Sequence, residues 1–401
     1  MSEAESPYAW WRLLAAVLLS TIGGVGLWSI VVALPAVQAE FGVARAGASL
    51  PYTFTMLAFM VGGVVMGRLA DRFGVVLPVV IGALALGVGY TATAFAPDIA
   101  SYAALYAIFI GGMGSCAVFG PLVADTSLWF TRRRGIAVAL CASGNYFAGA
   151  FWPPVLQHFI AEHGWRSTHL GIAAFCVVTM LPLALAMRRP PPKQAAGATA
   201  LAAGGLARLG LSPNALQGLL ILAGLSCCVA MAMPQVHIVA YCVDLGYGAA
   251  RGAEMLALML GFGVVSRLIS GVITDRIGAA AMLLLGSFLQ MVALALFLPF
   301  DSLSSLYVVS AIFGLFQGGI VPSYTILIRQ FFPPAEAGFR IGLVLSSTLA
   351  GMALGGWLSG LIFDATASYQ MAVVNGIAWN LLNLSIAAWL LLRARATMAL
   401  A

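Results

Sequence analysis

Charged residues are scarce in this sequence. Lysine, arginine, aspartate and glutamate make up 8% of its 401 residues, whereas hydrophobic residues make up 62%. A soluble domain carries roughly 25% charged residues, so the scarcity excludes a water-soluble fold and predicts a polytopic membrane protein. The formal net charge of +6 does not indicate nucleic-acid binding, because most of the basic residues map to one side of a membrane.

The sequence also lacks side chains at the spacing that metals or cofactors require. All six cysteines fall in apolar segments, so we expect buried structural cysteines, no metal site and no cofactor. An intramembrane enzyme would need a nucleophile and a base, or a metal cluster, at one depth, and no such set is evident. The first apolar run lacks a small-residue cleavage site, which favours a retained first span.

Long apolar runs predict an all-α fold of twelve transmembrane helices in two pseudo-symmetric six-helix bundles. We expect an N-terminal bundle at 1–187, a cytoplasmic linker rich in Pro, Ala and Gly at 188–212, and a C-terminal bundle at 213–401. Of the 19 basic residues, 15 fall in loops and helix ends on one side. The positive-inside rule therefore places both termini in the cytoplasm, across a bacterial-type inner membrane.

The motif G-x-x-x-D-R-x-G occurs twice, at 67–74 and at 271–278, with an offset of 204 residues (278 − 74). Two similar apolar halves are typical of alternating-access transporters. We interpret the two copies as conformational latches at the cytoplasmic face. In each copy the glycines form the turn, and the aspartate and arginine form hydrogen bonds or ion pairs with helix ends or charged residues in the same half. A plain polar turn is the alternative. The latch residues are Gly67, Asp71, Arg72, Gly74, Gly271, Asp275, Arg276 and Gly278.

Arg267 lies within the eighth apolar run, nine residues before Arg276, which is about 13 Å along a helix. A charge at that depth costs several kcal/mol or more unless something compensates it. We interpret Arg267 as the ligand of an anionic substrate, held as a bidentate carboxylate pair. The alternatives are a pair with Asp125 or a guanidinium held by backbone carbonyls.

Several other side chains within the apolar runs are candidates for lining the substrate site. His237 could relay a proton, or it could make an interhelical hydrogen bond. The polar candidates could likewise be interhelical contacts. His158, His163 and His169 fall near an outer loop, where we expect solvated side chains. The candidates besides Arg267 are Tyr324, Gln317, Asn145, Tyr146, His237, Phe119 and Trp28.

The repeated motif resembles the signature of the major facilitator superfamily. The resemblance to that family covers essentially the whole chain. Within it, the chain looks most like the monocarboxylate-porter and oxalate/formate-antiporter branch, whose arginine in helix eight binds the substrate carboxylate and matches Arg267. The segment from Trp129 to Gly135 resembles that branch's junction of helices four and five. The animal carriers have an aspartate where this chain has Gly263 and a lysine where it has Ala36.

These observations predict a secondary transporter that carries small organic anions across the lipid bilayer as a monomer. We expect a monocarboxylate:proton symporter in which Arg267 binds the carboxylate. The alternative within this class is an exchanger of mono- or dicarboxylates without proton coupling. A more distant alternative is a membrane sensor of small anions that does not transport.

Overall fold

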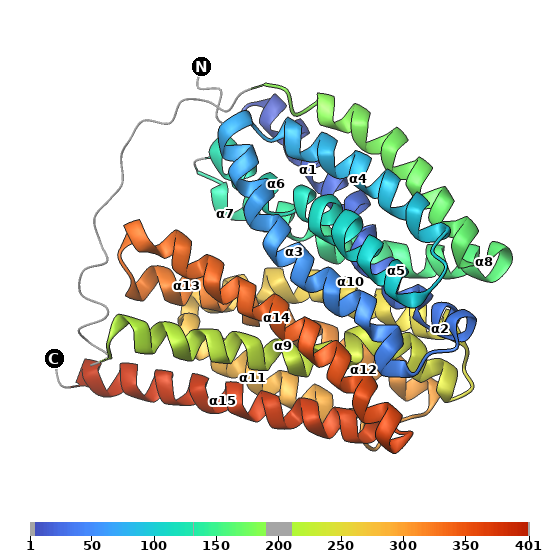
Figure 1. Cartoon of the computed structure of the whole chain (residues 1–401). Helices are drawn as coiled ribbons and strands as arrows, with labels where there is room; N and C mark the ends of the chain where they lie inside the picture. Colours follow the sequence, from blue (N-terminus) through green and yellow to red (C-terminus); the bar gives the residue numbers. More distant parts are fainter. Residues whose placement is uncertain (1–4, 131, 190–210, 400–401) are drawn as a thin grey trace. The chain divides into compact units, whose positions relative to one another are not determined.

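The structure is a computed structural model, and it describes residues 5–130, 132–189 and 211–399. The described residues form helices joined by short connections (Figure 1). Eleven helical stretches are long and apolar enough to cross a membrane. One of them, Gly135–Leu185, has 51 residues, and Gly164 interrupts it with φ of +77°. This stretch therefore holds two spans, and the prediction of a twelve-span all-α fold is confirmed.

The elements below keep the labels of Figure 1. The first six spans contain α1 (Pro7–Gly23), α2 (Val25–Phe41), α3 (Arg45–Phe73), α4 (Val76–Ala94), α5 (Ile99–Leu105), the π-helix η1 (Tyr106–Gly114), the 3₁₀ helix η2 (Ser115–Val118), α6 (Gly120–Trp129), α7 (Arg134–Ala142) and α8 (Gly144–Leu185). The remaining spans contain α9 (Pro213–Asp244), α10 (Ala249–Ile277), α11 (Ala279–Leu296), α12 (Leu303–Gln317), α13 (Ile320–Phe331), α14 (Pro334–Thr366) and α15 (Tyr369–Ala399).

The chain forms two compact units. The first contains residues 1–195 and 238–261, and the second contains 196–237 and 262–401. Unlike the halves expected from the repeat, the first unit includes the end of α9 and the start of α10. Most of the expected linker at 188–212 lies outside the described residues.

The sequence repeat has a structural counterpart in α3 and α10. Each helix has 29 residues, and both ends are offset by 204 residues (249 − 45 and 277 − 73), the offset of the repeated motif. Each helix ends in the same way, because the N–H of Gly74 donates to Ala70 and that of Gly278 donates to Thr274, both at 2.8 Å. The two glycines have φ of +81° and +85°, which side chains with a Cβ rarely adopt.

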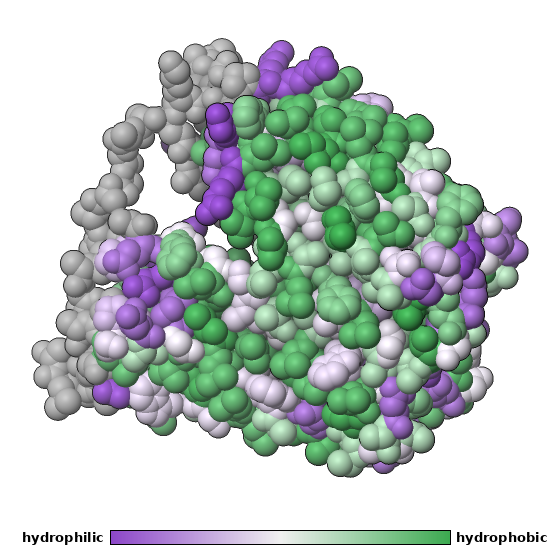
Figure 2. All heavy atoms as spheres, in the orientation of Figure 1, coloured by the Kyte–Doolittle hydropathy of each residue, from purple (hydrophilic) through white to green (hydrophobic). Residues whose placement is uncertain are grey.

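Apolar side chains cover much of the protein's outside. Figure 2 shows hydrophobic residues across most of the visible face, and Val178 and Leu392 are about 70% and 67% exposed. Such a surface suits lipid chains better than water.

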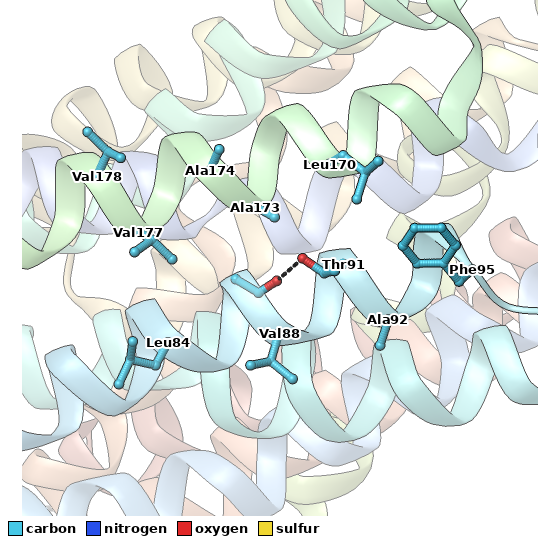
Figure 3. A pocket seen from close by; sticks show the side chains of 11 residues that line it. Leu84, Val88, Thr91, Ala92, Phe95, Leu170, Ala173, Ala174, Val177 and Val178 are labelled. Carbon is cyan, nitrogen blue, oxygen red and sulfur yellow. Dashed lines mark hydrogen bonds between the residues drawn. The ribbon is translucent and has the colours of Figure 1, made fainter.

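A groove of about 640 Å³ lies on this surface between α4 and α8 (Figure 3). Its lining is almost wholly apolar, and the Thr91 hydroxyl donates to the Gly87 carbonyl at 2.8 Å. No charged side chain is among the residues that line it. This groove is therefore an unsuitable site for an anion.

Candidate functional site

Four spans lose regular α-helical geometry partway across. The first breaks at Gly24, between α1 and α2, and the fifth breaks at Ser143, between α7 and α8. The fourth passes through η1 and η2, and the tenth breaks at Gly318 and Gly319, between α12 and α13. The last two breaks are equivalent in the repeat, since 318 − 204 is 114, the end of η1. Irregular backbone within a membrane is tolerated where protein buries it or where it lines a cavity.

A small cavity in the first unit lies at three of these breaks. It has about 10 Å³ accessible to the centre of a water molecule, which is room for about one water. The cavity brings together Phe119 and Asn145, two of the residues predicted to line a substrate site. Its lining is Ser20, Gly24, Leu27, Phe59, Ser115, Val118, Phe119 and Asn145.

Asn145 has an unused acceptor at this cavity. Its side-chain Oδ1 is buried and makes no hydrogen bond with any residue that the structure describes. Its backbone carbonyl accepts a hydrogen bond from the Trp28 indole at 3.1 Å, so a third predicted residue is fixed beside it. A buried acceptor without a partner costs about 1–3 kcal/mol, and a donor group on a substrate would remove that cost. Tyr146 follows Asn145 on α8 and is 8% exposed.

In the second unit, α10 places Arg267 beside the break in the tenth span. Ser266, the preceding residue, accepts a hydrogen bond from the Gly318 backbone N–H at 3.1 Å. A Cβ on Gly318 would lie 2.8 Å from the Gly263 carbonyl oxygen, so glycine lets the two segments approach this closely. Arg267 itself is half-buried, and its Nε atom is shielded from solvent.

Gln317, which ends α12, is next to this contact. Its Oε1 accepts a hydrogen bond from Gln235 of α9 at 2.6 Å. Its Nε2 is buried and has no hydrogen-bond partner among the described residues. The amide of Gln317 and the guanidinium of Arg267 therefore each follow or precede, in sequence, a residue of the Ser266–Gly318 contact. Both groups bind carboxylate oxygens.

The structure places Tyr324 and His237 inside the helix packing of the second unit. The Tyr324 hydroxyl donates to Asn383 Oδ1 at 2.8 Å. His237 Nε2 lies 2.8 Å from the Gly356 carbonyl oxygen, and Nδ1 lies 3.0 Å from the Tyr369 hydroxyl. Because a carbonyl only accepts, Nε2 carries the proton and Nδ1 accepts from Tyr369. This is the interhelical arrangement that the sequence offered as the alternative to a proton relay.

Asp125 is not available to Arg267. Both of its oxygens accept hydrogen bonds from Arg12 at 2.9 Å, from Nε and from Nη2. The two side chains are 3% and 8% exposed, and the Arg12 guanidinium lies over the Trp129 ring at 4.7 Å. The sequence placed these residues near the inner ends of two spans but did not pair them.

His169 is also not where the sequence suggested. It is 1% exposed, and its Nδ1 lies 3.0 Å from the Thr93 hydroxyl. Its ring packs against the rings of Tyr90, Tyr102 and Trp165. The expectation of a solvated histidine was wrong, because His169 lies beyond Gly164 within the next span, on the face that packs against α4. His158 and His163 are exposed, as expected.

The two latch loops are exposed. The glycines Gly74 and Gly278 form the turns, whereas Gly67 and Gly271 face open space. Asp71, Arg72, Asp275 and Arg276 are all exposed. None of the four forms a hydrogen bond or ion pair through its side chain with another residue in the described parts of the chain, and Arg72 only lies over the Phe73 ring at 5.1 Å. The turn geometry is present, but the described residues do not form the charged contacts of a latch.

Some residues at these sites were not predicted from the sequence. Ser20, Ser115 and Gln235 lie in apolar runs where a small or polar residue is common. The Ser29 hydroxyl lies 2.6 Å from both the Tyr90 and the Tyr106 hydroxyls, a buried contact of three spans. The sequence feature that could have indicated these sites is the pair of glycine or serine residues at each helix break.

Membrane-spanning helices that break partway across, two of them at equivalent points of the repeat, are typical of a transporter. One unit has a small cavity at such breaks, and the other has an arginine within a spanning helix beside one. The profile of the Major Facilitator Superfamily matches residues 16–305 and 255–400. The chain belongs to this superfamily, whose members are transporters of small molecules and not enzymes.

Relatives and a solved structure agree with this assignment. The chain is 26% identical to monocarboxylate transporter 11 of Homo sapiens over 387 residues, 91% of this chain and 80% of that protein. It is 25% identical to the MFS transporter asaE of Aspergillus flavus over 281 residues, 66% of this chain and 60% of that protein. A bacterial homologue of the human lysosomal transporter Spinster, solved in an inward-facing and unoccupied conformation, shares the fold with a TM-score of 0.74 at 15% identity over 99% of both chains.

Proposed function

We propose that this protein is a monocarboxylate:proton symporter that works by alternating access, with Arg267 as the ligand of the substrate carboxylate. The observation that carries the proposal is the position of Arg267, within a membrane-spanning helix and beside the break of the tenth span. A charge within a membrane is costly and marks a functional site by default. The similarity to a protein named monocarboxylate transporter 11 supports the same substrate class.

Arg267 and Gln317 together suit a carboxylate. The guanidinium supplies charge and two parallel donors, and the buried Gln317 Nε2 supplies a further donor without a partner among the described residues. In the first unit, Asn145 Oδ1 would accept a hydrogen bond from a hydroxyl or other donor on the cargo. Phe119, Trp28 and Tyr146 would supply apolar and aromatic walls. Tyr324 and His237 would act by holding helices in position.

Binding would favour the conformational change because it removes two penalties. Burying a guanidinium alone in a closed, dry site is costly, and so is burying a carboxylate alone. A bound pair removes both, so the substrate shifts the population toward closed states. We propose that bundles 1–187 and 213–401, joined by the linker at 188–212, rock around this site. The loops at Asp71–Arg72 and Asp275–Arg276 would latch the inner side when it closes.

Exchange of anions without proton coupling is the second candidate, and two contacts favour it. Asp125 is a buried carboxylate, but Arg12 already binds both of its oxygens. Both ring nitrogens of His237 are engaged by Tyr369 and Gly356. Both groups are therefore engaged in contacts within the protein. A sensor that binds anions without transport would show binding but no flux in vesicles.

Uptake into proteoliposomes tests the proposal. A panel of radiolabelled monocarboxylates and dicarboxylates is offered to the wild type, to Arg267→Ala and to Arg251→Ala. Arg251 is the matched control, since it lies on the same helix and its side chain is 53% exposed. We expect monocarboxylate uptake that rises with an inward proton gradient, is lost in Arg267→Ala and persists in Arg251→Ala. Uptake that needs only internal anion would establish exchange, and uptake independent of Arg267 would refute the proposed site.

We further propose a monomer in a bacterial-type inner membrane, with both termini in the cytoplasm. The basic residues that set this orientation include Arg188 and Arg189, which follow α8. In the same orientation Arg45, Arg166 and Arg251 face outward. Accessibility of terminal tags to an impermeant protease in right-side-out vesicles tests the orientation.

A further inference from the structure

Three segments of the first unit meet where α1 begins. The Tyr8 hydroxyl donates to the Ala186 carbonyl, just beyond the end of α8, at 2.8 Å. The Tyr8 ring packs edge-on against the ring of Trp129, the last residue of α6, with centroids 5.3 Å apart. The Glu5 carboxylate accepts a hydrogen bond from the backbone N–H of Arg133 at 2.8 Å. The start of α1 therefore joins the α6–α7 connection to the end of α8, and we call this the α1 junction.

The α1 junction presents four exposed arginines from two connections. Arg132 and Arg133 lie between α6 and α7, and Arg188 and Arg189 follow α8. In the part of the chain that the structure describes, none of the four forms an ion pair with a carboxylate. The junction therefore gathers guanidinium groups whose charge no described ion pair neutralises.

Two of these guanidinium groups lie over aromatic rings of α1. Arg189 is 4.5 Å from the centroid of the Tyr8 ring, and Arg133 is 5.9 Å from that of Trp10. A cation–π contact restrains the charged group and uses none of its N–H donors. The donors remain available for oxygen atoms, and the guanidinium fork matches a phosphate with two parallel hydrogen bonds.

Two buried donors at the same junction also have no acceptor. Arg12 Nη1 and Trp129 Nε1 are shielded from solvent and make no hydrogen bond with any residue that the structure describes. The Arg12 guanidinium lies over the Trp129 ring at 4.7 Å. A buried donor without an acceptor is costly, and an anionic oxygen would satisfy it directly or through a bridging water. The junction is thus rich in donors and short of acceptors, which suits an anion.

The helix face beside the junction favours a phospholipid over a soluble anion. Trp11 is 70% exposed, Leu14 is 47% exposed and Leu18 is 41% exposed. Their spacing of three and four residues places them on one face of α1. An exposed tryptophan at the end of a span is typical of the level of the lipid headgroups. Acyl chains can therefore lie along this face while the headgroup phosphate reaches the arginines.

The sequence repeat does not require this arrangement. With the offset of 204 residues, Trp10 corresponds to Asn214 in the second half (10 + 204). Arg133 corresponds to Ala337 (133 + 204). The aromatic and arginine residues of the α1 junction therefore belong to the first half alone and are not needed for the helix arrangement that the two halves share.

We propose that the α1 junction binds the phosphate of an anionic phospholipid. The four exposed arginines bind the phosphate oxygens, and the acyl chains lie along the face of Trp11, Leu14 and Leu18. The lipid then links the start of α1 to both connections. The site is independent of Arg267 and of the proposed cargo, because it involves neither. The proposed orientation only decides which leaflet supplies the lipid.

Native mass spectrometry of the full chain in detergent tests the site. The protein is titrated with phosphatidylglycerol and, separately, with phosphatidylcholine that carries the same acyl chains. We expect the wild type to bind phosphatidylglycerol more tightly. Arg188→Gln with Arg189→Gln should weaken that binding about 25-fold, since each arginine near an anionic lipid contributes a factor of about five. Arg188→Lys with Arg189→Lys should weaken it less, because lysine keeps the charge but loses the parallel donors.

The control is Arg329→Gln with Arg393→Gln, which removes the same charge from the ends of two spans in the second unit and should leave phosphatidylglycerol binding unchanged. If the first pair of substitutions does not give monodisperse protein, Arg133→Gln tests the same site and should weaken binding about fivefold. Equal binding of the two lipids by the wild type, or an equal loss in the control, would overturn the proposal. Competition by inorganic phosphate at the concentration of the lipid would show a free-phosphate site and would overturn it as well.

Discussion

Replacing Asp125 by Asn tests how strongly the buried ion pair with Arg12 stabilises the fold. The carboxylate accepts two hydrogen bonds at 2.9 Å, and the arginine is 3% exposed. Asparagine keeps one acceptor oxygen but leaves the guanidinium charge without its counter-ion. Breaking a buried pair by removing one partner costs about 3–5 kcal/mol. Because one hydrogen bond can persist, we expect the lower end of that range, about 3 kcal/mol.

The double variant Arg12→Met with Asp125→Leu provides the sharper test. Replacing both charges by apolar side chains of similar size is often neutral or stabilising, and methionine can pack against the Trp129 ring that now lies under the guanidinium. We therefore expect the double variant to be within about 1 kcal/mol of the wild type. Glu336→Gln is the control, since its pair with Arg340 has a carboxylate that is 53% exposed and should contribute about 0.5 kcal/mol or less.

Thermal unfolding in detergent, followed with a thiol-reactive fluorophore, measures these differences. The six cysteines are buried, so labelling reports their exposure on unfolding. The reasoning is refuted if Asp125→Asn unfolds at the wild-type midpoint, or if the double variant is as unstable as the single one.

Four other substitutions give distinct outcomes. Gly62→Ala should impair folding, because a Cβ would overlap the Gly112 carbonyl oxygen, whereas Gly63→Ala should be tolerated, because nothing lies within 4 Å of that site; the yield of monodisperse protein measures both. His237→Gln should leave the pH dependence of uptake unchanged, because both ring nitrogens are used in interhelical hydrogen bonds; a shifted pH profile would restore the relay. Asp71→Asn should slow transport more than it weakens substrate binding, and an unchanged transport rate would count against a latch.

The sequence predicted the membrane fold because length and apolar composition suffice to define a span. The repeat also carried over, since α3 and α10 share length, offset and terminal glycine geometry. The fifth and sixth spans, which the sequence predicted as separate helices, are divided in the structure at Gly164, where φ is +77°.

Side-chain partners were harder to predict. Membrane helices are apolar on all faces, so periodicity does not show which face is buried. This is why the sequence did not distinguish Tyr324, packed in a core, from Asn145, which lines a cavity. The pairing of Arg12 with Asp125 and the burial of His169 depend on contacts between distant segments, which sequence spacing does not encode. The helix breaks at Gly24 and Gly318 likewise depend on neighbours, because each glycine faces another helix closely.

Equilibrium binding of the best-transported monocarboxylate to purified wild type, Arg267→Ala, Arg267→Lys and Arg251→Ala tests the central claim most directly. Truncating one partner of a buried charge pair costs about 2–5 kcal/mol or more, so Arg267→Ala should weaken binding by about a hundredfold, a value within that range. Arg267→Lys should recover part of the affinity, since it keeps the charge but loses the bidentate geometry. Arg251→Ala should bind like the wild type. Wild-type affinity in Arg267→Ala would contradict the account.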